Sequence, residues 1–91
     1  MTEIEMSDAA ATALGKLYDA NDPLADAVDQ WLDAIENDPG AAAVKRHRIR
    51  PGKVWAIVVR DPRGQEDWII LWELEASGPM VHYLGINTLV K

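Results

Sequence analysis

Two segments near the N-terminus have apolar residues at helical spacing. The first predicts a helix over residues 7–20, with Ser7 as its N-cap. The second predicts a helix that follows Asp22 and Pro23 and ends at the breaker Asp38-Pro39-Gly40. The apolar faces consist of Ala10, Leu14, Leu17 and Tyr18 in the first helix and of Leu24, Val28, Trp31, Leu32 and Ile35 in the second.

The connection between these helices is short. Asn21 tolerates a left-handed backbone after the first helix, Asp22 is a candidate N-cap, and Pro23 fits the first helical position. Helices joined by so short a link pack antiparallel, so the sequence predicts a helix hairpin.

After Gly40 the apolar pattern changes from helical to strand-like. Strands are predicted at residues 44–50, 54–59, 68–74 and 80–86, with turns at 51–52, 61–64 and 77–79. The continuous apolar character of residues 54–59 predicts a central strand that is covered on both faces. A further short edge strand is predicted at residues 3–6. The predicted fold class is α+β: a short N-terminal strand, an antiparallel helix hairpin, then a three- to four-stranded antiparallel sheet with both helices on one face.

Length and composition narrow the class of protein. A chain of 91 residues predicts one domain, residues 1–91, and its 48% hydrophobic content is ample for one core. No long apolar segment or basic leader is present, so we expect a cytoplasmic protein with no membrane association. With no cysteine and two histidines, neither a metal site nor a cofactor is expected.

Charge is divided unevenly along the chain. Residues 1–38 hold ten acidic residues and one basic residue, a net charge of −9, whereas residues 39–91 hold eight basic and five acidic residues, a net charge of +3. The acidic side chains of the second helix recur at helical spacing opposite its apolar face. This division is a hint about charged partners, not about fold.

The segment of residues 44–53 concentrates basic side chains. In an extended strand, Arg46, Arg48 and Arg50 project from one side. Together with Lys53 and Arg60 they form a candidate anion-binding or RNA-binding surface. Two other interpretations stay open: an exposed edge strand that charge protects from aggregation, and pairing with the acidic helices of a second copy.

The last predicted strand contains His82 and Tyr83, which strand alternation places on opposite faces. His82 then shares its face with the apolar residues Met80, Leu84 and Ile86. A histidine satisfied in apolar surroundings is therefore favoured over a general acid or base.

The preceding strand contains Glu73 and Glu75 two positions apart, so both project from one face. Paired carboxylates serve acid–base chemistry in some sites, but strands commonly have such pairs for solubility.

Four segments, taken in order, suggest a family. MSDAAATALGKL (residues 6–17) runs from a strand into a helix with Ala and two Leu residues, and the second helix ends at Asp38-Pro39. WIILWEL (residues 68–74) is a central apolar strand, and VHYLG (residues 81–85) lies in the final strand. In this order and spacing, over nearly the whole chain, the sequence resembles the RelE/ParE superfamily of bacterial toxin–antitoxin systems.

The resemblance implies a small α+β toxin that an antitoxin peptide or protein neutralises by wrapping over it. Some members of this superfamily cleave mRNA on the ribosome, using basic side chains on the concave sheet face, and others poison DNA gyrase. The present chain has Ile69 where the family's central strand has Arg, and Ile86-Asn87 after Gly85 where the family has His-Arg. The basic segment of residues 44–53 is then the main remaining place for anion recognition.

Two functions follow as hypotheses. The first is a toxin-like component of a toxin–antitoxin system that cleaves RNA or inhibits translation through an altered active site, with Arg48, Arg50 and His82 as catalytic candidates and RNA or the ribosome as target. The second is a non-catalytic protein-interaction module on the same fold, acting as a homodimer.

Overall fold

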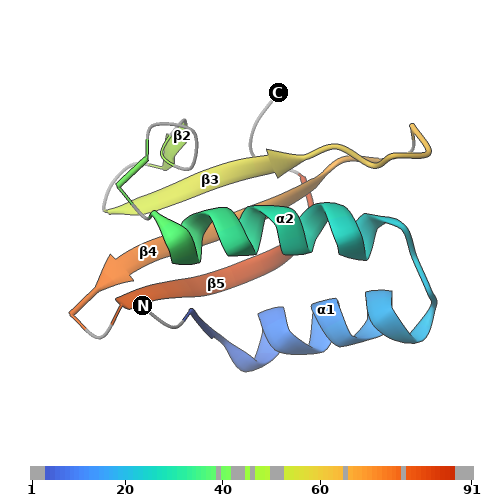
Figure 1. Ribbon diagram of the computed structural model, residues 1–91, viewed down its shortest axis with the longest axis horizontal. Coiled ribbons are helices and arrows are strands. Elements are labelled where there is room, and N and C mark those ends of the chain that lie inside the picture. Colours follow the sequence, from blue (N-terminus) through green and yellow to red (C-terminus); the bar gives the residue numbers. More distant parts are fainter. Residues whose placement is uncertain are drawn as a thin grey trace.

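The computed structural model describes residues 4–38, 40–41, 45, 47–49, 53–64, 66–76 and 78–87, with residues 47–49 described by their backbone. Its elements, in order, are β1 (Glu5–Met6), α1 (Asp8–Asp19), α2 (Leu24–Asn37), β2 (His47–Ile49), β3 (Val54–Val59), β4 (Trp68–Glu75) and β5 (Gly78–Ile86). Figure 1 shows α1 and α2 side by side on one face of the sheet.

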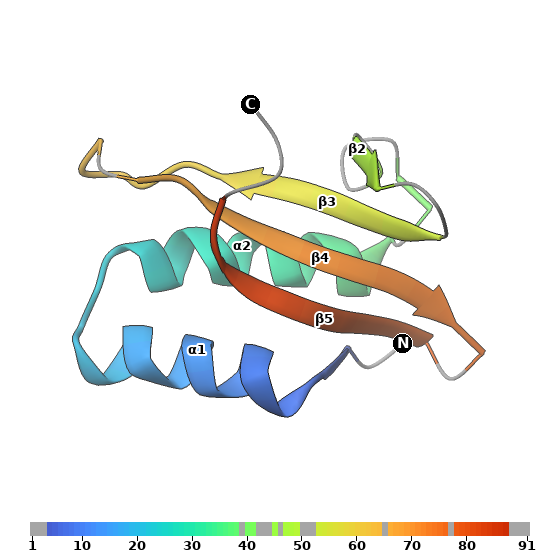
Figure 2. The same ribbon diagram turned by 180° about the vertical axis from the view of Figure 1, so that it is seen from behind.

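The sheet has five strands in the order β1-β5-β4-β3-β2. β1 pairs with β5 in parallel, and the β2–β3, β3–β4 and β4–β5 pairs are antiparallel. The reverse view shows the strands in front of α2, with α1 alongside β5 (Figure 2). Residues of both helices and of the sheet share one buried cluster, so the hairpin covers one face of the sheet and leaves a helix-free face. This arrangement confirms the predicted α+β fold class.

Ser7 begins α1 and also joins it to the sheet. Its hydroxyl accepts a hydrogen bond from the Ala10 backbone N–H at 3.2 Å, which confirms the predicted N-cap. The same hydroxyl donates to the His82 carbonyl at 2.9 Å, and the Ser7 backbone N–H donates to the Val81 carbonyl at 2.8 Å. One residue therefore caps the helix and attaches its start to β5.

The link between α1 and α2 has the predicted backbone chemistry. Asn21 has a left-handed φ of 52°. The Asp22 carboxylate accepts from the Leu24 backbone N–H at 2.9 Å, and Pro23 has helical angles just before α2 begins. The expected helix hairpin is thereby confirmed, with α2 beginning at Leu24.

The core lies between the helix hairpin and the sheet. Its fully enclosed sheet residues include Trp72 and Val81, which are both 0% exposed. The buried residues of this cluster are Ala10, Leu14 and Leu17 of α1, Leu24, Ala25, Val28, Leu32 and Ile35 of α2, and Ile57, Val59, Ile70, Trp72, Val81 and Leu84 of the sheet. Ala56 and Ile69, whose strand positions alternate with core positions, are buried as well, so β3 and β4 have buried residues on both faces.

One sequence boundary needs correction. The turn expected at residues 77–79 is shorter, because Gly78 and Pro79 already pair with Glu75 and Leu74 in the β4–β5 hairpin. Gly78 adopts a φ of 125°, which a glycine reaches without steric cost, and so allows the tight reversal. In the expected strand at residues 44–50, β2 covers His47–Ile49. Residues 44, 46 and 50 and the expected turn at 51–52 lie outside the described residues, as do residues 88–91.

Among the described residues, no helix combines the length and the apolar character needed to cross a bilayer.

Arg63 ties the β3–β4 loop to the helix link. Its guanidinium lies 3.1 Å from the Asp61 carboxylate and 3.1 Å from that of Asp22, and its backbone N–H donates to Asp61 at 2.8 Å. Hydrogen bonds from the Arg63 side chain, and then from its backbone, hold the pKa of Asp61 below the ordinary value of 3.8. The ionised form of Asp61 is therefore favoured by folding.

We expect Asp61→Asn to lower the free energy of unfolding at pH 7, because it removes a carboxylate whose pKa is depressed in the folded state. This contribution is present above pH 3.8 and is lost as the pH falls below it, where the unfolded state binds the proton more readily. Urea unfolding should show a smaller difference in the free energy of unfolding between Asp61→Asn and wild type at pH 3 than at pH 7. Glu66→Gln, an exposed carboxamide change in the same loop, serves as control; an Asp61→Asn difference that stays constant with pH would contradict the assignment.

The two helices also meet through Tyr18 and Asp29. The Tyr18 hydroxyl lies 2.5 Å from both carboxylate oxygens of Asp29. This hydrogen bond, with a smaller contribution from burial and from the charges of neighbouring acids, raises the pKa of Tyr18 to about 12.

In the Tyr83→Phe background, absorbance at 295 nm should follow Tyr18 alone and give a midpoint near pH 12. Asp29→Asn should move that midpoint towards the ordinary value of 10.0, since it removes the negative charge and leaves one neutral acceptor oxygen in place of two charged ones. Because the folded-state pKa is raised, this bond contributes stability that is complete below pH 10 and lost as the pH rises towards 12. Unfolded protein in denaturant is the control, and equal midpoints in folded and unfolded protein would refute the assignment.

Candidate functional site

An irregularity in the β4–β5 ladder determines which side chains reach the helix-free face. Leu71 pairs with Tyr83, but the next residue, Trp72, pairs with Val81, so His82 is an additional residue in β5. Val81 and Leu84 both belong to the core although they are three positions apart, and the two residues between them are both exposed. A β-bulge of this kind re-aims a side chain without ending the strand.

The expectation that His82 and Tyr83 lie on opposite faces, with His82 among apolar residues, is wrong. Strict alternation fails at the bulge, so both side chains project away from the core, and the His82 side chain is 38% exposed. Leu84, expected beside His82, instead packs in the core at 3% exposure.

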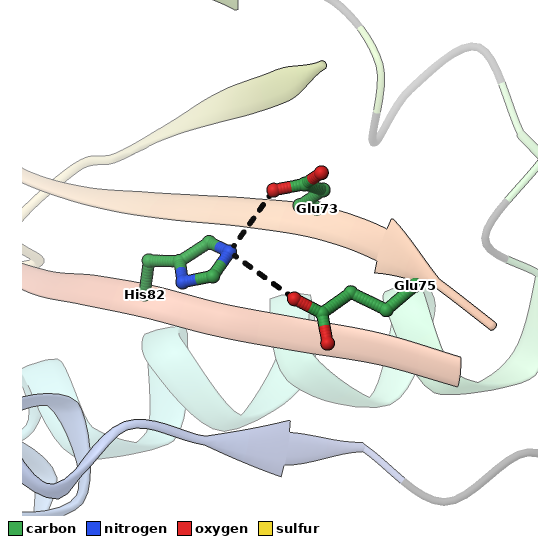
Figure 3. Close-up of side chains that lie close together, drawn as sticks. All are labelled: Glu73, Glu75 and His82. Carbon is green, nitrogen blue, oxygen red and sulfur yellow. Dashed lines mark hydrogen bonds and ion pairs between the residues drawn. The ribbon is translucent and has the colours of Figure 1, made fainter. Parts of the chain in front are cut away.

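His82 lies between the carboxylates of Glu73 and Glu75, which project from β4 (Figure 3). Its Nε2 atom is 3.2 Å from Oε2 of Glu73 and 3.9 Å from Oε1 of Glu75. One donor atom from each of the three residues lies within 4.8 Å of the other two. We refer to these three residues as the Glu73–Glu75–His82 cluster; the sequence predicted that the two glutamates share a face, and the bulge adds the histidine.

The electrostatics of this cluster exclude some ligands. Among the residues that the structure describes, Glu73 and Glu75 form ion pairs with His82 and with no lysine or arginine. Two carboxylates beside one imidazole repel a phosphate group and attract a cation. The cluster suits a divalent metal ion, a cationic side chain of a partner, or proton exchange at Nε2 of His82, and it does not suit binding of an RNA backbone.

Tyr83 lies along β5 over Gly85. A Cβ atom added at Gly85 would be 2.5 Å from the Tyr83 hydroxyl oxygen and 2.8 Å from Cζ, and the hydroxyl donates to the Ile86 carbonyl at 3.4 Å. Tyr83 as a whole is 39% exposed, so its ring presents an aromatic surface next to His82. The glycine is what allows the ring to lie against the strand.

Two members of the predicted anion-binding surface, Lys53 and Arg60, are described with their side chains. Lys53 and Arg60 are exposed and flank the two ends of β3, roughly 20 Å apart along the strand. Arg48 is paired with Trp55 in the β2–β3 ladder, and Arg46 and Arg50 lie outside the described residues. The anion-binding surface therefore stays a prediction.

The catalytic candidates Arg48 and His82 lie on strands far apart in the sheet. β2 and β5 are separated by β3 and β4, which is three strand spacings, or about 14 Å. Their backbone positions do not favour joint action on one phosphate. Lys45, from the same segment, instead lies over the ring of Trp55, with its Nζ atom 5.5 Å from the ring centroid.

A separate hollow of about 560 Å³ lies on the helix side, where α1 passes Trp68. Its polar lining comes from Asp8, Thr12 and Lys16. Its described lining residues include no histidine, and it is distinct from the Glu73–Glu75–His82 cluster.

No match was found for this chain among family models, characterised proteins or solved structures. The assignment of function accordingly depends on the fold, on the cluster and on the sequence resemblance.

The packing of Tyr83 on Gly85 predicts a coupled pair of substitutions. Gly85→Ala should lower the free energy of unfolding by about 1 kcal/mol, because the new methyl group displaces the ring. The loss should disappear in the Tyr83→Ala background, as measured by urea unfolding in a double-mutant cycle. Gly15→Ala is the control: nothing lies within 4 Å of an added Cβ there, so a helical alanine should stabilise. If the effects of Gly85→Ala and Tyr83→Ala on the free energy of unfolding simply add, the destabilisation does not come from contact with the Tyr83 ring.

Proposed function

We propose that this protein is a toxin-like component of a bacterial toxin–antitoxin system, and that its helix-free sheet face binds the partner. The proposal rests on the resemblance to the RelE/ParE superfamily and is supported by the element order, a short strand, a helix hairpin and then an antiparallel meander. The observation that carries it is one-sided coverage: both helices pack on one face, and the other face presents Glu73, Glu75, His82 and Tyr83.

The cluster also suggests the chemistry of the partner segment. Glu73 and Glu75 attract a lysine or arginine side chain, and Tyr83 offers an aromatic surface beside them. An antitoxin segment with a basic residue next to an apolar one fits this face. The acidic outer surface of the helices, with Asp26 and Asp33 exposed, would strengthen the attraction for a basic partner over a longer range.

A second candidate function is the non-catalytic interaction module, in which the protein acts through binding or as a homodimer. The observation that favours it is the pair of carboxylates next to His82, because a ribonuclease needs cations around the scissile phosphate. If RNA cleavage does occur, the residues expected to support it are Arg48 and Arg50 of the basic segment rather than His82.

Induced expression should arrest bacterial growth, and co-expression of the neighbouring reading frame should relieve the arrest and give a complex that co-purifies. Glu73→Lys with Glu75→Lys should weaken that complex at least about tenfold, since charge repulsion replaces attraction. Glu66→Lys, which reverses a single carboxylate away from the cluster, is the control, and it is compared with Glu73→Lys and Glu75→Lys made one at a time.

Growth arrest with position-specific mRNA cleavage would support the ribonuclease form of the toxin. A stable complex or homodimer without arrest, at confirmed soluble expression, would support the interaction module and refute toxicity. Equal weakening by Glu66→Lys would show that the partner binds elsewhere.

A further inference from the structure

We infer that the Glu73–Glu75–His82 cluster is a binding site for one divalent transition-metal ion, with Zn²⁺ as the representative ligand. This inference does not rest on the proposed function. The ligands would be Nε2 of His82 and one carboxylate oxygen from each glutamate (Figure 3).

The donor atoms lie close enough together for small side-chain adjustments to bring them around one ion, since all three are within 4.8 Å of one another. Ligands at about 2.0–2.2 Å from Zn²⁺ lie about 3.0–3.5 Å from each other in tetrahedral or octahedral geometry. The distance from Nε2 of His82 to Oε2 of Glu73, 3.2 Å, is already within this range. The distance to Oε1 of Glu75 is 3.9 Å, and a rotamer adjustment of this exposed side chain closes the difference.

The chemical types of the ligands favour a transition metal. Imidazole nitrogen suits Zn²⁺, Co²⁺ and Ni²⁺, whereas Mg²⁺ and Ca²⁺ prefer sets made only of oxygen. Two carboxylates neutralise the charge of a divalent ion when His82 is neutral. Among the described residues, no lysine or arginine pairs with either glutamate, so no fixed cation already occupies this position.

The scaffold under the cluster is rigid. Glu73 follows Trp72 and His82 follows Val81, and these two core residues are both 0% exposed and are paired across the β4–β5 ladder. Backbone positions held by such packing keep the ligands close together before an ion arrives, which lowers the cost of binding. The bulge is essential, because it turns His82 to the face from which the glutamates project.

Three protein ligands leave further coordination positions, and these open on the helix-free face. Sites with three protein ligands keep such positions for water, a substrate or a group from another molecule. A metal here would therefore leave open positions for water or for a small ligand on this face.

The test is a calorimetric titration of untagged protein with Zn²⁺ at pH 7.5, together with the absorption spectrum on adding Co²⁺. We expect one ion per chain, and at least about tenfold weaker binding in His82→Gln and in Glu73→Gln. His47→Gln and Glu66→Gln are the matched controls and should bind as wild type does.

Far-UV circular dichroism of each variant without metal establishes that the fold is intact. Mg²⁺ at the same concentration should not compete with Zn²⁺. Absence of saturable Zn²⁺ binding to the folded wild type, unchanged affinity in His82→Gln, or equal weakening in His47→Gln would each overturn the site. Because none of these measurements uses growth or a partner, failure here is distinct from failure of the proposed function.

Discussion

Burial of both Val81 and Leu84 in the core beneath the helix hairpin is the constraint on which the functional face depends. A regular strand sends residues three positions apart to opposite faces, yet both of these side chains lie in the core. The bulge at His82 resolves the conflict, because it inserts one residue into β5 while Trp72 stays paired with Val81. Packing against the helices thus determines that His82 and Tyr83 both reach the helix-free face.

The same division into two faces organises the charges. The inner face is covered by a hairpin whose exposed surface is acidic, and the link of that hairpin is held to the β3–β4 loop by the ion pairs of Arg63 with Asp22 and Asp61. The outer face bears its own carboxylates at one end of β4. The exposed cations Lys53 and Arg60 flank the two ends of β3, and all residues of β3 between them are apolar.

Local chemistry was sufficient to predict the helices and the fold class. Ser7, Asn21 and Asp22 act within a few residues of themselves, so their roles follow from the sequence. The bulge could not be predicted in this way, because register depends on how two strands satisfy a common core. The association of His82 with Glu73 and the pairing of Arg63 with Asp22, 41 residues away, depend on the assembled fold for the same reason.

The attachment of Ser7 to β5 has a consequence for biosynthesis. Its bonds to Val81 and His82 join residues that are about 75 positions apart, and β1 has β5 as its strand partner. During translation β1 leaves the ribosome before β5, and about 75 residues separate the two partners. Until β5 emerges, the sheet edge is open, and α1 lacks its connection to the sheet. The domain can therefore close only after β5 has been synthesised, because β5 supplies the partner of β1 and the attachment of α1.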